Sequence, residues 1–102
     1  PSTGIQENIP RIFFLSQNFP NPFLGRTVIE YGLPKKARVR LCIYNAVGQL
    51  VGVLDEGDKQ AGYYKPKWSG RDDRDKSLPS GIYFIRMTTA EFTKTRKMIL
   101  IQ

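Results

Sequence analysis

Histidine is absent from this 102-residue chain, and cysteine occurs once, as Cys42. The missing imidazole excludes the catalytic triads that need histidine and the usual zinc-ligand sets, and a single cysteine excludes an internal disulfide. No apolar run approaches the roughly 20 residues of a membrane-spanning helix, so we expect no transmembrane segment. Because no activated nucleophile or convincing carboxylate pair is visible either, the sequence favours a non-catalytic protein that needs no cofactor.

Positive charge exceeds negative charge, with 16 Lys and Arg against 9 Asp and Glu, so the net charge is +7. Part of this excess forms two clusters, Lys35, Lys36, Arg38 and Arg40 in one and Lys94, Arg96 and Lys97 in the other. No helix-turn-helix, aromatic RNA-binding motif or zinc spacing accompanies them. We therefore expect no specific nucleic-acid complex, and interpret the clusters as solvated faces that keep edge strands from aggregating.

Alternation with a period of two predicts β-strands. It is clearest over residues 29–33, 39–43 and 82–87, while residues 13–15 and 92–101 provide an opening edge and a closing strand. Residues 82–87 are apolar on both sides, so this strand should be central or lie under a loop. With nine Gly and seven Pro to form turns, the chain is expected to be all-β, an immunoglobulin-like antiparallel sandwich of about seven strands.

Turn residues mark the connections between these strands. Residues 45–48 should form a hairpin in which Gly48 takes a positive φ, residues 55–58 and 60–62 should frame a second connection, and residues 70–81 a longer polar loop. Pro66 lacks an N–H group, which predicts an edge strand or a bulge there. We expect residues 1–10 to be the end of a linker and residues 11–102 to be one domain of a larger protein, because the first residues lack the pattern of a signal peptide.

The order of several motifs resembles the type A C-terminal sorting domains of the type IX (Por) secretion system. The Ig-like domain of the flagellar hook-capping protein family is similar. The matching segments are Leu15–Phe23 (LSQNFPNPF), Thr27 with Ile29-x-Tyr31-x-Leu33-Pro34, Val39–Asn45, Ala61-Gly62, Trp68-x-Gly70-Arg71-Asp72, Ser80–Phe84 and Lys97–Gln102. The chain departs from the pattern at Leu24, Pro66 and Lys76, where Asn, an apolar residue and Gly are common. The resemblance implies a β-sandwich that is read by an outer-membrane translocon.

Two segments are candidates for such recognition. The candidate residues are Lys97, Met98, Leu100 and Ile101 in the last strand, and Asn18, Pro20, Asn21, Pro22 and Phe23 in the asparagine- and proline-rich segment. The last strand is apolar on both faces, so one face can join the core while the other meets a partner. Each segment also has a purely structural interpretation, as a closing strand and as a rigid rim whose prolines restrict φ and whose phenylalanines plug the sandwich.

Trp68, with Tyr63 and Tyr64 nearby, could form a sugar-stacking strip, although a single strand tryptophan is more often a core anchor. Asp72, Asp73 and Asp75 are weak candidates for binding Ca²⁺. The glycine and bidentate glutamate of a helix-loop-helix calcium site are missing, so we expect a solvated turn and no metal.

The leading functional hypothesis is a non-catalytic sorting module that directs an upstream cargo domain of the same chain through the type IX translocon. Its partners would be translocon proteins, and the protein would be exported to the periplasm and then to the cell surface or medium. We expect a monomer. The alternatives are an accessory carbohydrate- or surface-binding module of a secreted hydrolase and an assembly domain of the hook-capping type.

Overall fold

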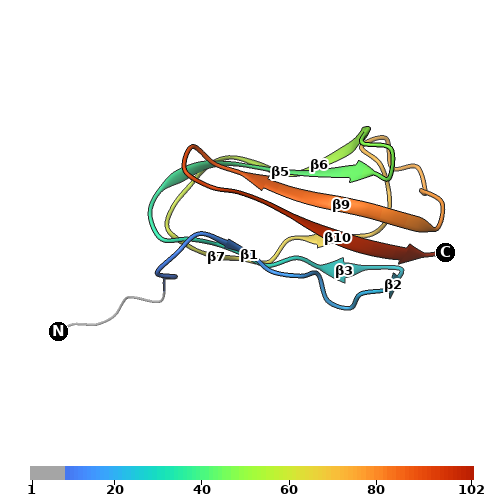
Figure 1. The fold of residues 1–102 in the computed structure, drawn as a ribbon, viewed down its shortest axis with the longest axis horizontal. Coiled ribbons are helices and arrows are strands. Elements are labelled where there is room, and N and C mark those ends of the chain that lie inside the picture. The colour runs from blue at the N-terminus through green and yellow to red at the C-terminus, as the bar shows by residue number, and fades with distance from the viewer. Residues whose placement is uncertain (1–8) are drawn as a thin grey trace.

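Backbone pairing in the computed structural model, which describes residues 9–102, forms strands and no helix (Figure 1). The strands are β1 (Phe14–Leu15), β2 (Phe23–Leu24), β3 (Thr27–Val28), β4 (Tyr31–Leu33), β5 (Ala37–Asn45), β6 (Leu50–Lys59), β7 (Gly62–Tyr64), β8 (Lys67–Trp68), β9 (Gly81–Thr88) and β10 (Thr93–Ile101). Within residues 9–102 there is consequently no helix that could cross a membrane. The all-β prediction is confirmed.

The strands form two facing layers. One layer is a five-stranded sheet in the order β2-β10-β9-β5-β6, and the other combines β1-β4-β7 with the pair β3-β8. All pairs are antiparallel except the short parallel pair of β2 with β10. Figure 1 shows β5, β6 and β9 in the upper layer and β1, β3 and β7 in the lower layer.

The predicted count of about seven strands agrees with this arrangement once interrupted strands are joined. β3 and β4 are one strand broken at residues 29–30, and β7 and β8 are one strand broken at Lys65 and Pro66. β1 and β2 are two halves of an opening strand that passes from one layer to the other. Pro66 thus lies at an edge of the smaller layer, where its missing N–H group disrupts no central ladder.

The core lies between the two layers and contains the residues expected from the alternation. β5, β9 and β10 contribute Val39, Leu41, Ile43, Tyr83, Ile85, Met87, Met98 and Leu100, and the opposite layer contributes Leu15, Ile29, Tyr31, Leu33 and Trp68. Phe23 of β2 plugs one end. β9 lies between β10 and β5, which confirms its predicted central position.

The prediction of a connection at residues 55–58 is wrong. These residues continue β6, whose register places Arg38 opposite Asp58 and Val39 opposite Gly57. The acidic and glycine residues are tolerated because β6 is an edge strand, where charged side chains can reach solvent. The predicted hairpin at residues 45–48 is confirmed, with a φ of 85° at Gly48. The predicted linker falls largely on residues 1–8, which lie outside the described residues.

Candidate recognition surface

The last strand, β10, divides its apolar residues between the two sides of the sheet. Met98 and Leu100 are fully buried in the core. Both were predicted as contact residues, and the structure corrects this because their side chains point between the layers, where no partner can reach them. Lys97, Ile99 and Ile101 alternate with them and therefore lie on the outer side.

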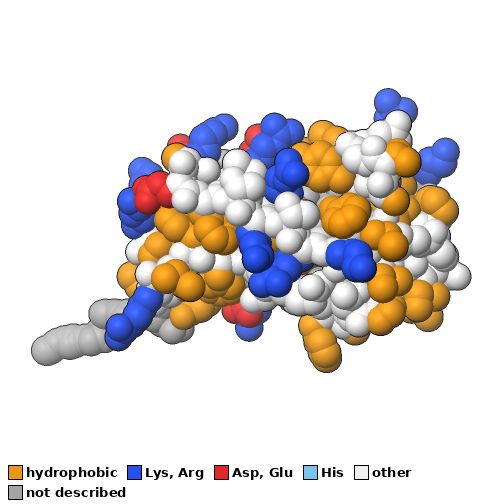
Figure 2. Space-filling model, in the orientation of Figure 1, with side chains coloured by type: hydrophobic (Ala, Val, Ile, Leu, Met, Phe, Trp, Pro, Cys, Tyr) orange, Lys and Arg blue, Asp and Glu red, His pale blue; other side chains and the backbone are white. Residues whose placement is uncertain are grey.

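Exposed apolar side chains continue from β10 onto its neighbours. Ile101 pairs with Leu24 of β2, and Ile99 pairs with Ile82 of β9. Leu24 is 72% exposed, Ile101 47% and Ile82 42%. Figure 2 shows hydrophobic side chains gathered at the end of the molecule where β10 ends. Together with Lys97, these residues form what we call the outer strip: Leu24, Ile82, Lys97, Ile99 and Ile101.

The segment of residues 18–23 is held in place by hydrogen bonds of its own. Asn18 is buried, and its Nδ2 donates to the Pro20 carbonyl at 3.1 Å and to Thr27 Oγ1 at 3.0 Å. The Thr27 hydroxyl in turn donates to the Pro20 carbonyl at 2.8 Å. Phe23 is buried against Trp68. Asn18 and Phe23 were candidates for recognition, but their burial leaves Pro20, Asn21 and Pro22 as the accessible candidates. Phe19, which was expected to plug the sandwich together with Phe23, is instead 79% exposed.

Two side chains from this N-terminal region cover the free edge of β10. Gln17 Nε2 donates to the Lys97 carbonyl at 2.6 Å, and the Ile99 N–H donates to Asn21 Oδ1 at 2.9 Å. Arg96 Nε also donates to the Leu15 carbonyl at 2.8 Å. These bonds replace a neighbouring strand where β2 is too short to pair, and an edge blocked in this way resists pairing with another sheet.

Trp68 is buried and therefore does not belong to an exposed sugar-stacking strip. Only 5% of it is exposed, its ring packs between Phe23 and Tyr83 at centroid distances of 5.6 and 5.5 Å, and its Nε1 donates to the Arg71 carbonyl. Tyr64 stacks on Tyr31 at 5.1 Å.

Tyr63, the third member of the predicted strip, is exposed, although its ring lies against Phe14 at a centroid distance of 5.9 Å. The three aromatic residues therefore do not form one exposed strip. The single tryptophan acts as the core anchor that the alternative interpretation described.

The acidic loop directs its carboxylates to different places. Asp72 Oδ1 accepts the N–H groups of Arg74 and Lys76, both at 2.9 Å. The bond from the Lys76 N–H is the main reason why the pKa of Asp72 lies below its ordinary value. The Asp73 carboxylate accepts a hydrogen bond from the Val53 N–H of β6, and Asp75 Oδ1 lies 3.8 Å from Arg71 Nε. Within residues 9–102 no three acidic, cysteine or histidine side chains converge as metal ligands would.

Members of both basic clusters have partners in the folded chain. Lys35 forms an ion pair with Glu91, and Arg38 Nη1 lies 3.8 Å from Asp58 Oδ1 across the β5–β6 ladder. Arg96 donates a hydrogen bond to the Leu15 carbonyl, as described above. Lys97 remains exposed on the outer strip. Interactions within the fold thus engage part of each basic cluster.

A polar cluster between the layers was not anticipated from the sequence. The Tyr31 hydroxyl donates to Asp55 Oδ2 at 2.7 Å, and Lys59 Nζ lies 3.0 Å from Asp55 Oδ1. Burial and this hydrogen bond raise the pKa of the Tyr31 phenol. Burial alone would raise the pKa of Asp55, but the hydrogen bonds from Tyr31 and Lys59 outweigh it, and that pKa lies below its ordinary value. The sequence did not indicate this cluster because residues 55–58 were predicted to form a connection, whereas Asp55 belongs to β6.

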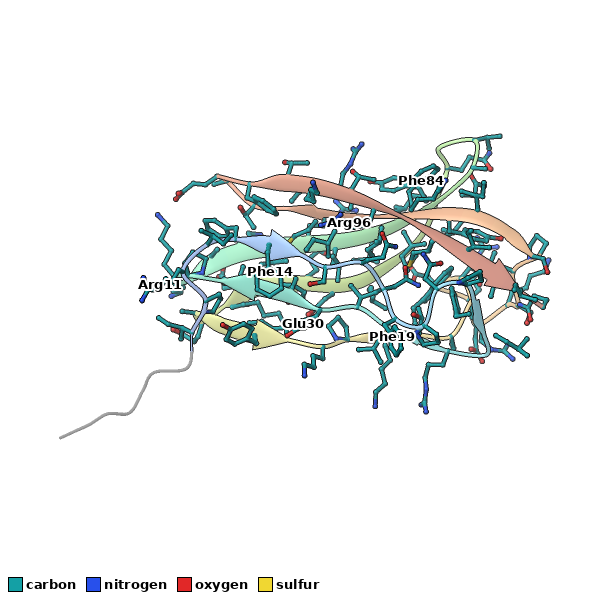
Figure 3. All side chains as sticks on the ribbon, turned by 60° about the horizontal axis from the view of Figure 1, so that its bottom comes forward. Arg11, Phe14, Phe19, Glu30, Phe84 and Arg96 are labelled. Atoms are coloured by element: carbon teal, nitrogen blue, oxygen red, sulfur yellow. The ribbon has the colours of Figure 1, made fainter. Side chains whose placement is uncertain are left out.

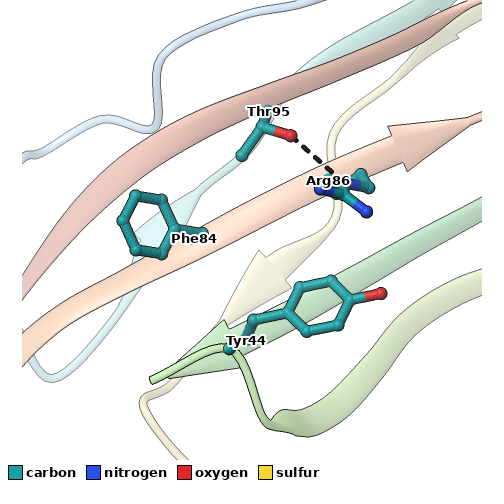
Figure 4. A pocket seen from close by; sticks show the side chains of 5 residues that line it. Tyr44, Phe84, Arg86 and Thr95 are labelled. Carbon is teal, nitrogen blue, oxygen red and sulfur yellow. Dashed lines mark hydrogen bonds between the residues drawn. The ribbon is translucent and has the colours of Figure 1, made fainter. Parts of the chain in front are cut away.

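A surface hollow beside the outer strip was also missed. It has a volume of about 270 Å³ and is lined by Tyr44, Gly48, Phe84, Arg86 and Thr95 (Figure 4). We call it the Arg86 hollow. The signal available in the sequence was the doubly apolar strand at residues 82–87, because the alternation that buries one set of side chains must expose the other.

The family model for the FlgD Ig-like domain matches residues 23–91, more than half of the chain. This chain belongs to the FlgD Ig-like domain family. The match runs from the Phe23 plug to the turn before β10, so it includes most of the sandwich described above. No curated protein matches the chain.

Two solved structures share the fold of this FlgD Ig-like domain. Dimeric latent PorU from Porphyromonas gingivalis matches with a TM-score of 0.69 and 18% identity, over 97% of this chain and 10% of PorU. PorZ, a surface component of the type-IX secretion system of the same organism, matches with a TM-score of 0.53 and 17% identity, over 88% of this chain and 11% of PorZ. The chain thus spans about a tenth of each of these proteins.

Proposed function

We propose that this FlgD Ig-like domain is a non-catalytic sorting module, which directs a cargo domain of the same protein through a type IX translocon to the cell surface or medium. The observation that carries the proposal is the outer strip. It is an exposed apolar face on a folded sandwich, next to the accessible residues Pro20–Pro22. The motifs that resemble type A sorting domains build both features, except for Leu24, where the chain departs from the pattern.

The physical argument rests on how the chain uses its apolar residues. Solvent-exposed apolar side chains are normal when scattered, but a contiguous group rimmed by charge is typical of a protein-binding surface. Here Leu24, Ile101 and Ile99 adjoin across paired strands, and Lys97 lies on the same face. The hydrogen-bonded rim at residues 18–23 holds β2 against β10, so the strip is presented in one conformation. A translocon could therefore read the folded domain without unfolding it.

A reporter protein fused ahead of residue 1, in a bacterium that has a type IX system, tests this function. The variant Lys97→Glu/Ile99→Asp/Ile101→Asp changes only outward side chains and leaves Met98 and Leu100 in the core. We expect its export to fall by at least about tenfold, the loss that roughly 1.4 kcal/mol of binding energy produces. Deletion of residues 92–102 should abolish export, but it also removes a core strand.

A matched control places the same charges on another part of the same sheet. Arg38→Glu/Leu50→Asp/Thr88→Asp alters three exposed positions of β5, β6 and the far end of β9, and its export should equal that of the original chain. Thermal unfolding must show that both triple variants fold. Normal export of the folded β10 variant would refute the proposal.

The family match favours one second candidate, an assembly domain of the hook-capping type. That function requires self-association or attachment to a filament, whereas a sorting module acts as a monomer. Sedimentation velocity separates the two, because a species that grows with concentration would favour assembly. The outer strip variant would then reduce self-association in place of export.

A further inference from the structure

The Arg86 hollow lies on the outer side of three adjacent strands. Tyr44 of β5 pairs with Phe84 of β9, and Arg86 of β9 pairs with Thr95 of β10. Figure 4 shows the Arg86 guanidinium near Tyr44 and Thr95, with the Phe84 ring further along β9. Arginine and tyrosine are the residue types that most often dominate the binding energy of protein interfaces.

Two contacts within the fold orient the Arg86 side chain. Its Cζ lies 5.6 Å from the centroid of the Tyr44 ring, and its Nε donates to Thr95 Oγ1 at 3.3 Å. The four ion pairs formed among the described residues all involve other cations. Within residues 9–102 the charge of Arg86 is therefore not neutralised by a carboxylate. Its terminal N–H groups can donate hydrogen bonds to a ligand without breaking one inside the protein.

This chemistry selects a carboxylate. A planar guanidinium binds a carboxylate through two parallel hydrogen bonds, and such charge-assisted bonds are about twice as strong as neutral ones. A lysine or arginine of a partner would be repelled by Arg86 itself.

The surroundings of the hollow indicate a protein as the source of that carboxylate. Lys97 lies opposite Phe84 in the ladder, and the apolar residues Ile82 and Ile99 lie next along the same two strands. A matching partner surface is apolar and carries acidic side chains. A second copy of this chain is a poor match, because its net charge is +7 and the same face would bring Arg86 and Lys97 against like charges.

The hollow also lies far from the start of the described chain. Figure 3 shows Arg11 at one end of the molecule and Phe84 toward the other. A cargo domain joined ahead of residue 9 would enter the fold away from this face and leave it free for a separate protein.

We propose that the Arg86 hollow receives a glutamate or aspartate side chain of a partner protein, whose surrounding surface is apolar and contacts the outer strip. The inference names the partner chemistry of the recognition face, and in that respect it rests on the proposed function. Binding can be measured without export, so each can fail separately.

Two probe peptides that differ in one group test the inference. Acetyl-Leu-Glu-Leu-amide carries the carboxylate, and acetyl-Leu-Gln-Leu-amide has nearly the same shape without the charge. Titrated into the ¹⁵N-labelled chain, the glutamate peptide should shift the amide signals of Tyr44, Phe84 and Thr95. It should bind at least about fivefold tighter than the glutamine peptide, the gain that a charge-assisted pair provides.

Three variants locate the effect. Arg86→Gln should remove the difference between the peptides, and Arg86→Lys should leave only part of it, since lysine keeps the charge and loses the two-pronged geometry. Arg38→Gln, the control at an exposed cation on β5 outside the hollow, should keep the full difference. Equal binding of the two peptides, shifts that map away from the hollow, or no shift at about 10 mM peptide would overturn the inference.

Vesicles distinguish a protein from a lipid source of negative charge. Vesicles of phosphatidylcholine with phosphatidylglycerol should bind the chain no differently when Arg86 is replaced by Gln. If that replacement abolished vesicle binding, the hollow would serve an anionic lipid and the inference would be wrong. If the peptides bind as expected but the β10 variant exports normally, only the sorting function fails.

Discussion

The two sides of the five-stranded sheet have similar residues and opposite roles. On the inner side Ile85, Met98 and Leu100 have almost no exposed surface, because the second layer covers them. On the outer side Ile82, Phe84 and Ile99 come from the same strands, but no second layer covers that side, and Ile82 remains 42% exposed. Hydrophobicity thus does not by itself mark the core, and apolar residues that a sandwich leaves uncovered are the ones available for recognition.

The largest expected effect is the loss of stability when a buried residue of β10 is shortened, which can be compared with the same change at its exposed neighbour. Leu100→Ala should lower the free energy of unfolding by about 2–5 kcal/mol, as for other buried leucines. Its methyl groups pack against Gly70, where an added Cβ would meet them at 3.0 Å. Ile101→Ala should cost less than about 1 kcal/mol because that side chain is outside the core. Urea denaturation measures both, and equal losses would contradict the assignment of the two faces.

Asp55, a polar residue on the inner side of the sheet, provides a second test of the comparison between the two sides. Asp55→Asn should cost about 1–3 kcal/mol, because it removes the ion pair with Lys59 and weakens the bond from the Tyr31 hydroxyl. The folded-state pKa of Asp55 is lowered, so its contribution is present above the unfolded pKa of about 3.9 and is lost as the pH falls through the folded value. The stability difference between the original chain and the variant should therefore shrink below about pH 4.

Tyr31 makes the stability of the same cluster depend on pH in a second range, at alkaline pH. Its folded-state pKa is raised, so the folded chain keeps the phenol proton where the unfolded chain releases it, and stability should decline as the pH rises above about 10. Tyr31→Phe, which cannot ionise, should reduce that alkaline decline. Thermal unfolding across the pH range measures both limits, and an unchanged alkaline slope in Tyr31→Phe would assign the decline to other groups.

The smallest effect concerns the edge between the two faces. Asn21→Ala removes the acceptor for the Ile99 N–H and should cost about 0.5–1.5 kcal/mol, with faster hydrogen exchange at that amide. Asn21→Asp keeps an acceptor oxygen and serves as the control, which should exchange slowly. If Asn21→Ala left the exchange of Ile99 unchanged, the side chain would not be what covers the edge of β10.

Much of the fold was predictable because alternation is a local signal. The inward sets around Leu41 and Ile85 follow from period two, and Gly48 indicates the hairpin turn because such a turn needs a positive φ, which glycine adopts readily. The connection predicted at residues 55–58 is wrong because acidic residues and a glycine are typical of turns, whereas an edge strand also tolerates them when the charged side chains reach solvent.

The candidate site was predicted less well than the fold. Lys97 and Ile101 lie on the exposed side as required, but Met98 and Leu100 do not. The four predicted residues come from both faces of β10, whereas a strand presents only every second residue to a partner. Asn18 and Trp68 were candidates by residue type, and burial decided against both. Arg86 was not considered because its aromatic neighbour Tyr44 is 42 positions away in sequence.

The sequence by itself determined that this polypeptide forms strands, where most of them turn, and which side chains alternate together. Only the tertiary structure decided which of two apolar sides became the core, how residues 17–24 cover the last strand, and that Tyr44, Arg86 and Thr95 meet around one hollow. The reason is that alternation depends on neighbours along the chain, whereas burial and convergence depend on which strands pair across long loops.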